Sequence, residues 1–159
     1  MLELRENNRM EHKSGKTLKT LATFNAPLAI VWDAWTKPEQ IAAWWGPAGF
    51  TTTIHEMDFR EGGEWRLTMH SAGGQNFPNR SIFKEVIPLK KIVFEHFNPH
   101  FITTVLFEGD NDKTTVDWSL EFDSPEMFDI IVKAHKAGQG QRENIEKLGK
   151  YLEGLRPNT

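Results

Sequence analysis

The sequence contains no cysteine among its 159 residues. This absence excludes disulfide bonds, catalysis by a thiol and metal sites built from thiolates, and it is compatible with a reducing compartment. The chain also lacks any apolar run near the ~20 residues that a membrane-spanning helix needs, and its start lacks the apolar segment of a signal peptide. We therefore expect a cytoplasmic protein that does not insert into membranes.

An excess of positive charge is absent as well. The chain has 19 Lys and Arg residues against 22 Asp and Glu residues, which gives a formal net charge of −3. The basic residues are scattered among acidic ones, whereas a nucleic-acid-binding surface is a cluster of Lys and Arg. This pattern excludes nucleic acid as a partner.

Sequence motifs of the common catalytic and cofactor-binding classes are also missing, including the nucleophile elbow, the P-loop and the HExxH zinc motif. The six histidines include no pair spaced i, i+4 on a helix, so we expect neither a metal site nor a cofactor. Asp58, Arg60 and Glu61 could form an acid–base cluster, but a solvated turn with an ion pair is the favoured interpretation. Catalysis is therefore not the expected function.

The segment from Ala26 to Pro47 contains four of the six tryptophans and two helix-start signals. Pro27 suits the start of a helix, because its missing N–H is not needed there. A second helix is predicted after Thr36, with Glu39 placed three residues on as in a capping box, and it ends before Gly46. We predict two short helices that close one end of the core, the first with an apolar face made of Leu28, Val31, Trp32 and Trp35.

Seven segments have the composition or the alternation of β-strands. The clearest is 64–70, where Trp65, Leu67 and Met69 share one face and polar residues occupy the other. Consecutive strands are separated by short turns, so the sequence predicts an antiparallel meander with one wet face. The predicted strands are 16–24, 50–58, 64–70, 77–87, 92–97, 102–107 and 115–122.

Residues 124–126 begin a long last helix, whose apolar residues recur every three or four positions as far as Leu152. A helix of ~28 residues would be ~42 Å long, enough to cross the whole domain. Gly138 and Gly140 lie in its middle, where each costs up to ~1 kcal/mol relative to alanine. Close packing or room for a ligand explains these glycines as well as a tolerated kink does.

The length fits one domain, which we place at 16–155 after a flexible N-terminal segment, residues 1–15. The motif VWDAWTKPEQIAAWWGP, followed by DFREGGEW, resembles the family related to the activator of heat-shock-protein-90 ATPase, within the START-like (SRPBCC) helix-grip superfamily. The resemblance extends over 16–153. It implies an α+β helix-grip fold, in which a curved antiparallel sheet of about six to seven strands wraps around a long C-terminal helix, with two short helices between strands one and two.

The resemblance further implies a cavity between the sheet and the last helix that binds a small hydrophobic or amphipathic ligand. Two polar residues lie on apolar faces: His96 shares a strand face with Ile92 and Phe94, and Gln141 lies on the apolar stripe of the last helix beside Arg142. A buried polar group needs a partner, which is either a neighbour or a ligand. The candidate ligand-binding residues are Trp65, Leu67, Met69, Phe94, His96, Trp118, Leu120, Ile131, Ala134, Gly138, Gln141 and Arg142.

Two other functions are left open by the sequence. The family name suggests a co-chaperone-like interaction module with a chaperone partner and a role in stress response. Other members of the superfamily suggest a cyclase-like or hydrolase-like enzyme, although no catalytic residue can be named here. A homodimer is also left open.

Overall fold

The computed structural model describes residues 2–5, 9–134 and 136–155. Its strands are β1 (Leu2–Arg5), β2 (Arg9–Ser14), β3 (Thr17–Phe24), β4 (Thr51–Met57), β5 (Glu64–His70), β6 (Asn76–Ile87), β7 (Lys91–Phe97), β8 (Phe101–Asp110) and β9 (Lys113–Phe122). Its helices are α1 (Leu28–Thr36), α2 (Pro38–Trp44), α3 (Pro125–Phe128), the π-helical segment Asp129–Ala134 and α4 (Ala137–Gly154).

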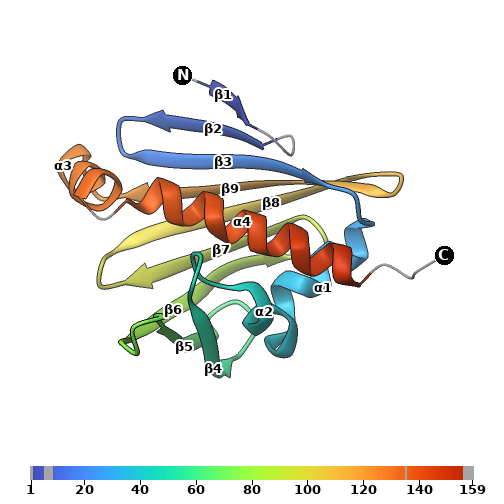
Figure 1. The fold of residues 1–159 in the computed structure, drawn as a ribbon, viewed down its shortest axis with the longest axis horizontal. Coiled ribbons are helices and arrows are strands. Elements are labelled where there is room, and N and C mark those ends of the chain that lie inside the picture. The colour runs from blue at the N-terminus through green and yellow to red at the C-terminus, as the bar shows by residue number, and fades with distance from the viewer. Residues whose placement is uncertain (1, 6–8, 135, 156–159) are drawn as a thin grey trace.

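All nine strands form one antiparallel sheet in the order β1-β2-β3-β9-β8-β7-β6-β5-β4. The sheet curves around α4, which lies along its inner face, and α1 and α2 cover the end near the C-terminus of α4 (Figure 1). This arrangement is the predicted helix-grip fold. None of the described helices combines the length and the hydropathy that a membrane span requires.

Strands β3 to β9 match the seven predicted strands, and the burial of β3, β7 and β9 alternates along the whole strand. In β9 the buried positions are Thr114, Val116, Trp118, Leu120 and Phe122, with more exposed residues between them. The segment expected to be flexible, residues 1–15, contains β1 and β2, and β2 pairs with β3 to extend the sheet beyond the predicted strands. Residues 1 and 6–8 of that segment lie outside the described part.

The turn before β5 depends on two glycines in sequence. Gly62 has a φ of +85°, which side chains other than glycine rarely adopt, and a Cβ on Gly63 would overlap the carbonyl oxygen of Asp58. The ion pair predicted at this turn is present, with 2.9 Å between Arg60 Nη2 and Asp58 Oδ2. The turn is therefore solvated and charged, as the sequence indicated.

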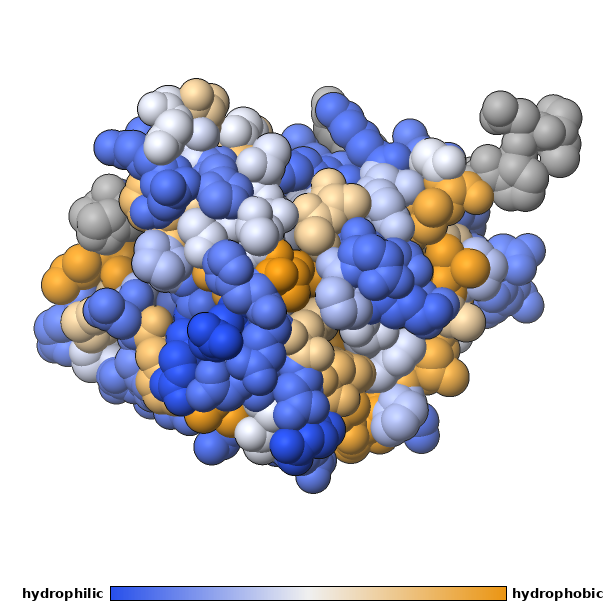
Figure 2. Space-filling view, turned by 90° about the horizontal axis from the view of Figure 1, so that it is seen from below, coloured by the Kyte–Doolittle hydropathy of each residue, from blue (hydrophilic) through white to orange (hydrophobic). Residues whose placement is uncertain are grey.

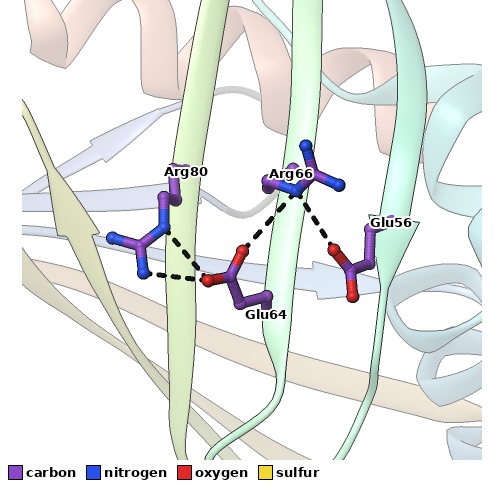
Figure 3. Close-up of polar contacts among 4 residues, drawn as sticks. All are labelled: Glu56, Glu64, Arg66 and Arg80. Carbon is purple, nitrogen blue, oxygen red and sulfur yellow. Dashed lines mark hydrogen bonds and ion pairs between the residues drawn. The ribbon is translucent and has the colours of Figure 1, made fainter.

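The outer face of the sheet carries a chain of ion pairs across β4, β5 and β6 (Figure 3). Arg66 Nε lies 3.1 Å from Glu56 and 3.5 Å from Glu64, and Arg80 Nη2 lies 2.9 Å from the other oxygen of Glu64. The hydrogen bond from Arg80 lowers the pKa of Glu64. On the side of the molecule that bears β4, β5 and α2, hydrophilic residues dominate, with smaller hydrophobic areas between them (Figure 2).

Helices α1 and α2 form the predicted pair, but the predicted capping box is wrong. The residue before α2 is Lys37, and the hydroxyl of Thr36 donates to the carbonyl oxygen of Trp32 at 2.9 Å. Thr36 is still in the last turn of α1, so its hydroxyl bonds back along that helix instead of reaching the amides of α2.

The last helix is not continuous, in contrast to the prediction. It is interrupted at Lys136, whose φ of +55° is left-handed, and the preceding π-helical turn changes which residues are buried. Phe128 and Val132 face the core, whereas Ile130 is 48% exposed. The apolar spacing of three and four continues across the break in the sequence, which is why the pattern did not reveal it. From Gly138 onward the predicted buried face is correct.

Candidate functional site

A cavity of about 170 Å³ lies between the inner face of the sheet, the first half of α4 and the segment that follows α2. Each of the strands β5 to β9 contributes two or three side chains to its wall, because inward positions alternate along each strand. The lining residues are Trp45, Gly46, Pro47, Trp65, Leu67, Met69, Asn79, Ser81, Phe94, His96, Phe101, Thr103, Trp118, Leu120, Ala137, Gly140, Gln141 and Asn144.

Eight of the twelve candidate residues line this cavity: Trp65, Leu67, Met69, Phe94, His96, Trp118, Leu120 and Gln141. The others do not. Ile131 and Arg142 are half-buried away from the cavity wall, and Gly138 is buried but lies outside it, because the break at Lys136 turns Ala137 and Gly140 toward the space instead. The side chain of Ala134 lies outside what the structure describes.

Several lining residues were missed by the sequence analysis. Ser81 and Thr103 continue the inward faces of Phe83 and Val105, so extending the alternation of β6 and β8 by one step would have found them. Trp45 was assigned only to the end of the core. No local sequence pattern marks Asn144 as a lining residue, because its hydrogen-bond partners belong to a segment that is distant in the sequence.

Aromatic rings form much of the cavity wall. The ring of Trp45 lies 5.1 Å from that of Trp65 and 5.5 Å from that of Trp118, measured between centroids. Phe94 meets Trp65 edge to face at 5.2 Å. Such a wall offers flat apolar surface to a ring-shaped ligand.

Gln141 is held by the protein itself. Its Oε1 accepts a hydrogen bond from the Thr20 hydroxyl at 2.6 Å, and its Nε2 donates to the Trp118 carbonyl at 3.2 Å. The side chain is 5% exposed, so these bonds satisfy an amide that burial would otherwise destabilise. Gln141 thus ties α4 to β3 and β9 while it borders the cavity.

His96 is also buried and has a partner at each ring nitrogen. Its Nδ1 lies 2.8 Å from the Pro99 carbonyl oxygen, its Nε2 lies 2.6 Å from Asn79 Oδ1, and its ring stacks on Phe101 at 4.3 Å. Burial lowers the pKa of His96. Because neither nitrogen is directed at Ser81, its cross-strand neighbour, the pair does not form a serine–base arrangement.

One end of the cavity is closed by contacts between α4 and the segment after α2. Asn144 accepts a hydrogen bond from the Gly46 amide at 3.2 Å and donates to the Trp44 carbonyl at 2.9 Å. Lys147 donates to the Phe50 carbonyl at 2.9 Å, and removal from water lowers the pKa of Lys147. These hydrogen bonds from side chains of α4 hold residues 44–50 over the cavity.

Some lining side chains have unpaired polar atoms. The indole nitrogens of Trp65 and Trp118 and the hydroxyl of Thr103 have no hydrogen-bond partner within the described part of the chain. The lining set contains no Asp, Glu, Lys or Arg, and among the described residues no three His, Asp or Glu side chains converge as metal ligands would. Among the described residues that line the cavity, His96 is the one titratable side chain.

His100, four residues after His96, lies between two carboxylates on the outer side of the same turn. Its Nε2 is 2.7 Å from Glu95 Oε2, and its Nδ1 is 2.7 Å from Asp123 Oδ1. Hydrogen bonds to Glu95 and then to Asp123 raise the pKa of His100 above its ordinary value of 6.5. The imidazolium joins β7 to the end of β9.

The charge of His100 is expected to make stability depend on pH. Because the pKa is raised in the folded protein, the stabilisation is complete below pH 6.5 and is lost as the pH rises through the raised pKa. Wild type should exceed His100→Gln in free energy of unfolding by less than about 1 kcal/mol, since the groups are partly exposed, and the difference should shrink as the pH rises through the raised pKa of His100. Urea melts at several pH values measure it. An NMR titration that places the pKa of His100 at or below 6.5 contradicts this prediction.

The family model of the Activator of Hsp90 ATPase homolog 1-like protein matches residues 25–153. The chain belongs to this family. The matched range begins three residues before α1 and ends one residue before the end of α4, so it includes every residue that lines the cavity. A comparison with curated proteins gives no match.

Several solved structures share the fold of this chain. A protein from Arthrobacter aurescens is 22% identical with a TM-score of 0.85 and 91% of each chain covered. Ms6760 from Mycobacterium smegmatis is 18% identical with a TM-score of 0.80 and 98% of each chain covered. An AHSA1-like protein from Aeromonas hydrophila is 20% identical with a TM-score of 0.69, over 89% of this chain and 97% of that one. At these identities the likeness concerns the fold alone.

Proposed function

We propose that this family member binds a small apolar or amphipathic molecule in the cavity between the sheet and α4. The observation that carries the proposal is the space of about 170 Å³, walled largely by aromatic and aliphatic side chains, between the sheet and α4. An engineered cavity of roughly 150 Å³ in another protein binds benzene, so this space suits a ligand with one ring or two fused rings. The family and the fold support a ligand-binding or interaction module in general.

The aromatic wall and the few polar groups favour binding over the alternatives. A cyclase or hydrolase needs a positioned acid or base, and His96 has both ring nitrogens engaged. A co-chaperone role needs a surface for a client, and nothing in the described residues distinguishes one. The cytoplasmic location, the possible chaperone partner and the oligomeric state stay predictions of the sequence.

Gly140 provides the sharpest test of the proposal. Among the described residues, a Cβ added there meets only Pro47 Cβ, at 3.8 Å, and Gly140 borders the cavity, so we expect a leucine side chain to extend into it. Gly140→Leu should weaken the binding of indane, a compact apolar probe, at least about tenfold by filling the space that the probe needs. The free energy of unfolding should change by less than about 1 kcal/mol, because leucine also favours the helix.

The control is Gly154→Leu, which makes the same substitution on the same helix, at a position where no atom of the described residues lies within 4 Å of the added Cβ. NMR titration of the tryptophan indole N–H signals with indane measures affinity in each variant. Wild type and Gly154→Leu should bind equally. Failure of the wild type to bind indane, or equal binding by Gly140→Leu, rejects the cavity as the site.

A further inference from the structure

We propose that the natural ligand is a small organic acid, a compact ring bearing a carboxylate, and that His96 as an imidazolium stabilises it through its positive charge, while both ring N–H groups stay on their protein acceptors. The proposal rests on the proposed function, since it concerns the same cavity. It adds to the proposed function that the ligand is negatively charged and that His96 selects the ligand by this charge. Three features of the cavity support it: the partners of His96, the lack of any acidic side chain, and an unpartnered hydroxyl beside the ring.

Both nitrogens of His96 face oxygen atoms that accept hydrogen bonds. The Pro99 carbonyl can only accept, so Nδ1 carries a proton. Asn79 turns its Oδ1 toward Nε2 because its Nδ2 donates to the Phe77 carbonyl at 3.0 Å. A neutral imidazole donates from one nitrogen alone, and only the imidazolium donates to both acceptors. The hydrogen-bond acceptors around His96 therefore favour the protonated, positively charged form of its ring.

The cavity does not supply a counter-charge for that imidazolium. The described residues that line it from β6, β8, α4 and the segment after α2 include no titratable side chain. Glu95, the residue before His96, alternates to the other face of β7 and is paired with His100 and Lys84, and His100 is itself cationic. Burial of an unpaired cation is unfavourable, which agrees with the lowered pKa of His96. A carboxylate on the ligand completes the charge balance and stabilises the protonated ring.

Ser81 provides a hydrogen bond for the same carboxylate. It is the cross-strand partner of His96, it lines the cavity, and it is 3% exposed. Its hydroxyl has no hydrogen-bond partner among the residues that the structure describes, so it is available to a ligand. A carboxylate between Ser81 and His96 leaves the ring of the ligand against Trp65 and the other aromatic side chains of the wall.

Three planar probes of the same shape separate charge from size: benzoate is anionic, benzamide is neutral and benzamidinium is cationic. Each is titrated into the intact protein, with the indole N–H signals followed by NMR, between about pH 6 and about pH 8, where benzoate stays ionised. We expect benzoate to bind about tenfold more tightly than benzamide at the lower pH, and benzamidinium to bind most weakly. The preference for benzoate should decrease as the pH rises, because His96 must take up a proton on binding.

His96→Gln should lose both the benzoate preference and its pH dependence. His100→Gln is the matched control, since it removes the neighbouring histidine outside the cavity and should keep both properties. A measurement on the wild type covers the case in which His96→Gln does not fold: benzoate should raise the pKa of His96 in an NMR titration.

Two outcomes overturn the inference. If benzoate binds no better than benzamide, or if its affinity is the same at both pH values, the cavity does not select an acid, although binding of indane leaves the proposed function intact. If neither indane nor any of the planar probes binds, the proposed function fails and the inference fails with it.

Discussion

Replacing Trp44 by alanine should lower the free energy of unfolding by ~3–5 kcal/mol, the range expected when a fully buried tryptophan is truncated. Trp44 is 1% exposed, its ring meets that of Trp35 edge to face at 4.8 Å, and its indole nitrogen donates to the Ala34 carbonyl at 3.0 Å. Truncation removes this packing and leaves the Ala34 carbonyl without its partner. The α1–α2 pair then loses the contact that joins its two helices.

Trp45→Ala is the matched comparison, because the neighbouring residue is half-buried and borders a cavity that is already empty of side chains. Its truncation enlarges existing space instead of creating a new one, so the loss should be smaller than for Trp44→Ala. Urea denaturation of the two variants measures the difference. If both cost less than ~1 kcal/mol, the helix pair is peripheral to the core.

Asn144→Ala should be the second most damaging change, with a loss of ~2–4 kcal/mol in the free energy of unfolding. Asn144 is 5% exposed and serves both the Gly46 amide and the Trp44 carbonyl. Alanine leaves these two buried backbone groups unpaired, and each unpaired group carries a desolvation penalty. The segment over the cavity should also open more often, which amide hydrogen exchange at Gly46 would detect.

Glu143→Ala provides the control for this prediction. Glu143 contacts the same segment through a hydrogen bond from the Ala48 amide at 3.2 Å, but that bond is exposed to solvent. Its loss should cost less than about 1 kcal/mol, because water replaces the missing partner. If denaturant melts show that the two alanine variants are equally stable, our interpretation that Asn144 stabilises the fold through two buried hydrogen bonds is wrong.

The sequence predicted those features that depend on local periodicity. Strand β5 and strand β9 alternate so regularly that Trp65, Leu67, Trp118 and Leu120 were assigned to the inner face, where they line the cavity. Helix α4 from Gly138 onward was assigned equally well, because Gln141 and its buried neighbours follow one helical stripe. In both cases the side-chain pattern repeats over a whole element, so no distant partner is needed to interpret it.

Features set by distant partners could not be predicted in this way. Asn144 and Gly46 are 98 residues apart in sequence, and no local pattern marks either as the partner of the other. The left-handed conformation of Lys136 is similarly invisible, since the apolar spacing runs through it. Ser81 is small and polar, so its place on an inner face follows only from its neighbours along β6. These are the positions on which the candidate site depends most.

The alternation of β5 has a consequence for how proteins of this kind diverge. Glu64 and Arg66 belong to the outer ion pairs, while Trp65 between them belongs to the cavity wall (Figure 3). Because sequence neighbours face opposite sides of one sheet, a mutation that alters the cavity leaves the charged exterior untouched, and the reverse holds as well. Selection can therefore change which ligands the cavity accepts without disturbing the solubility of the chain. The residues of each face can evolve independently of those on the other face.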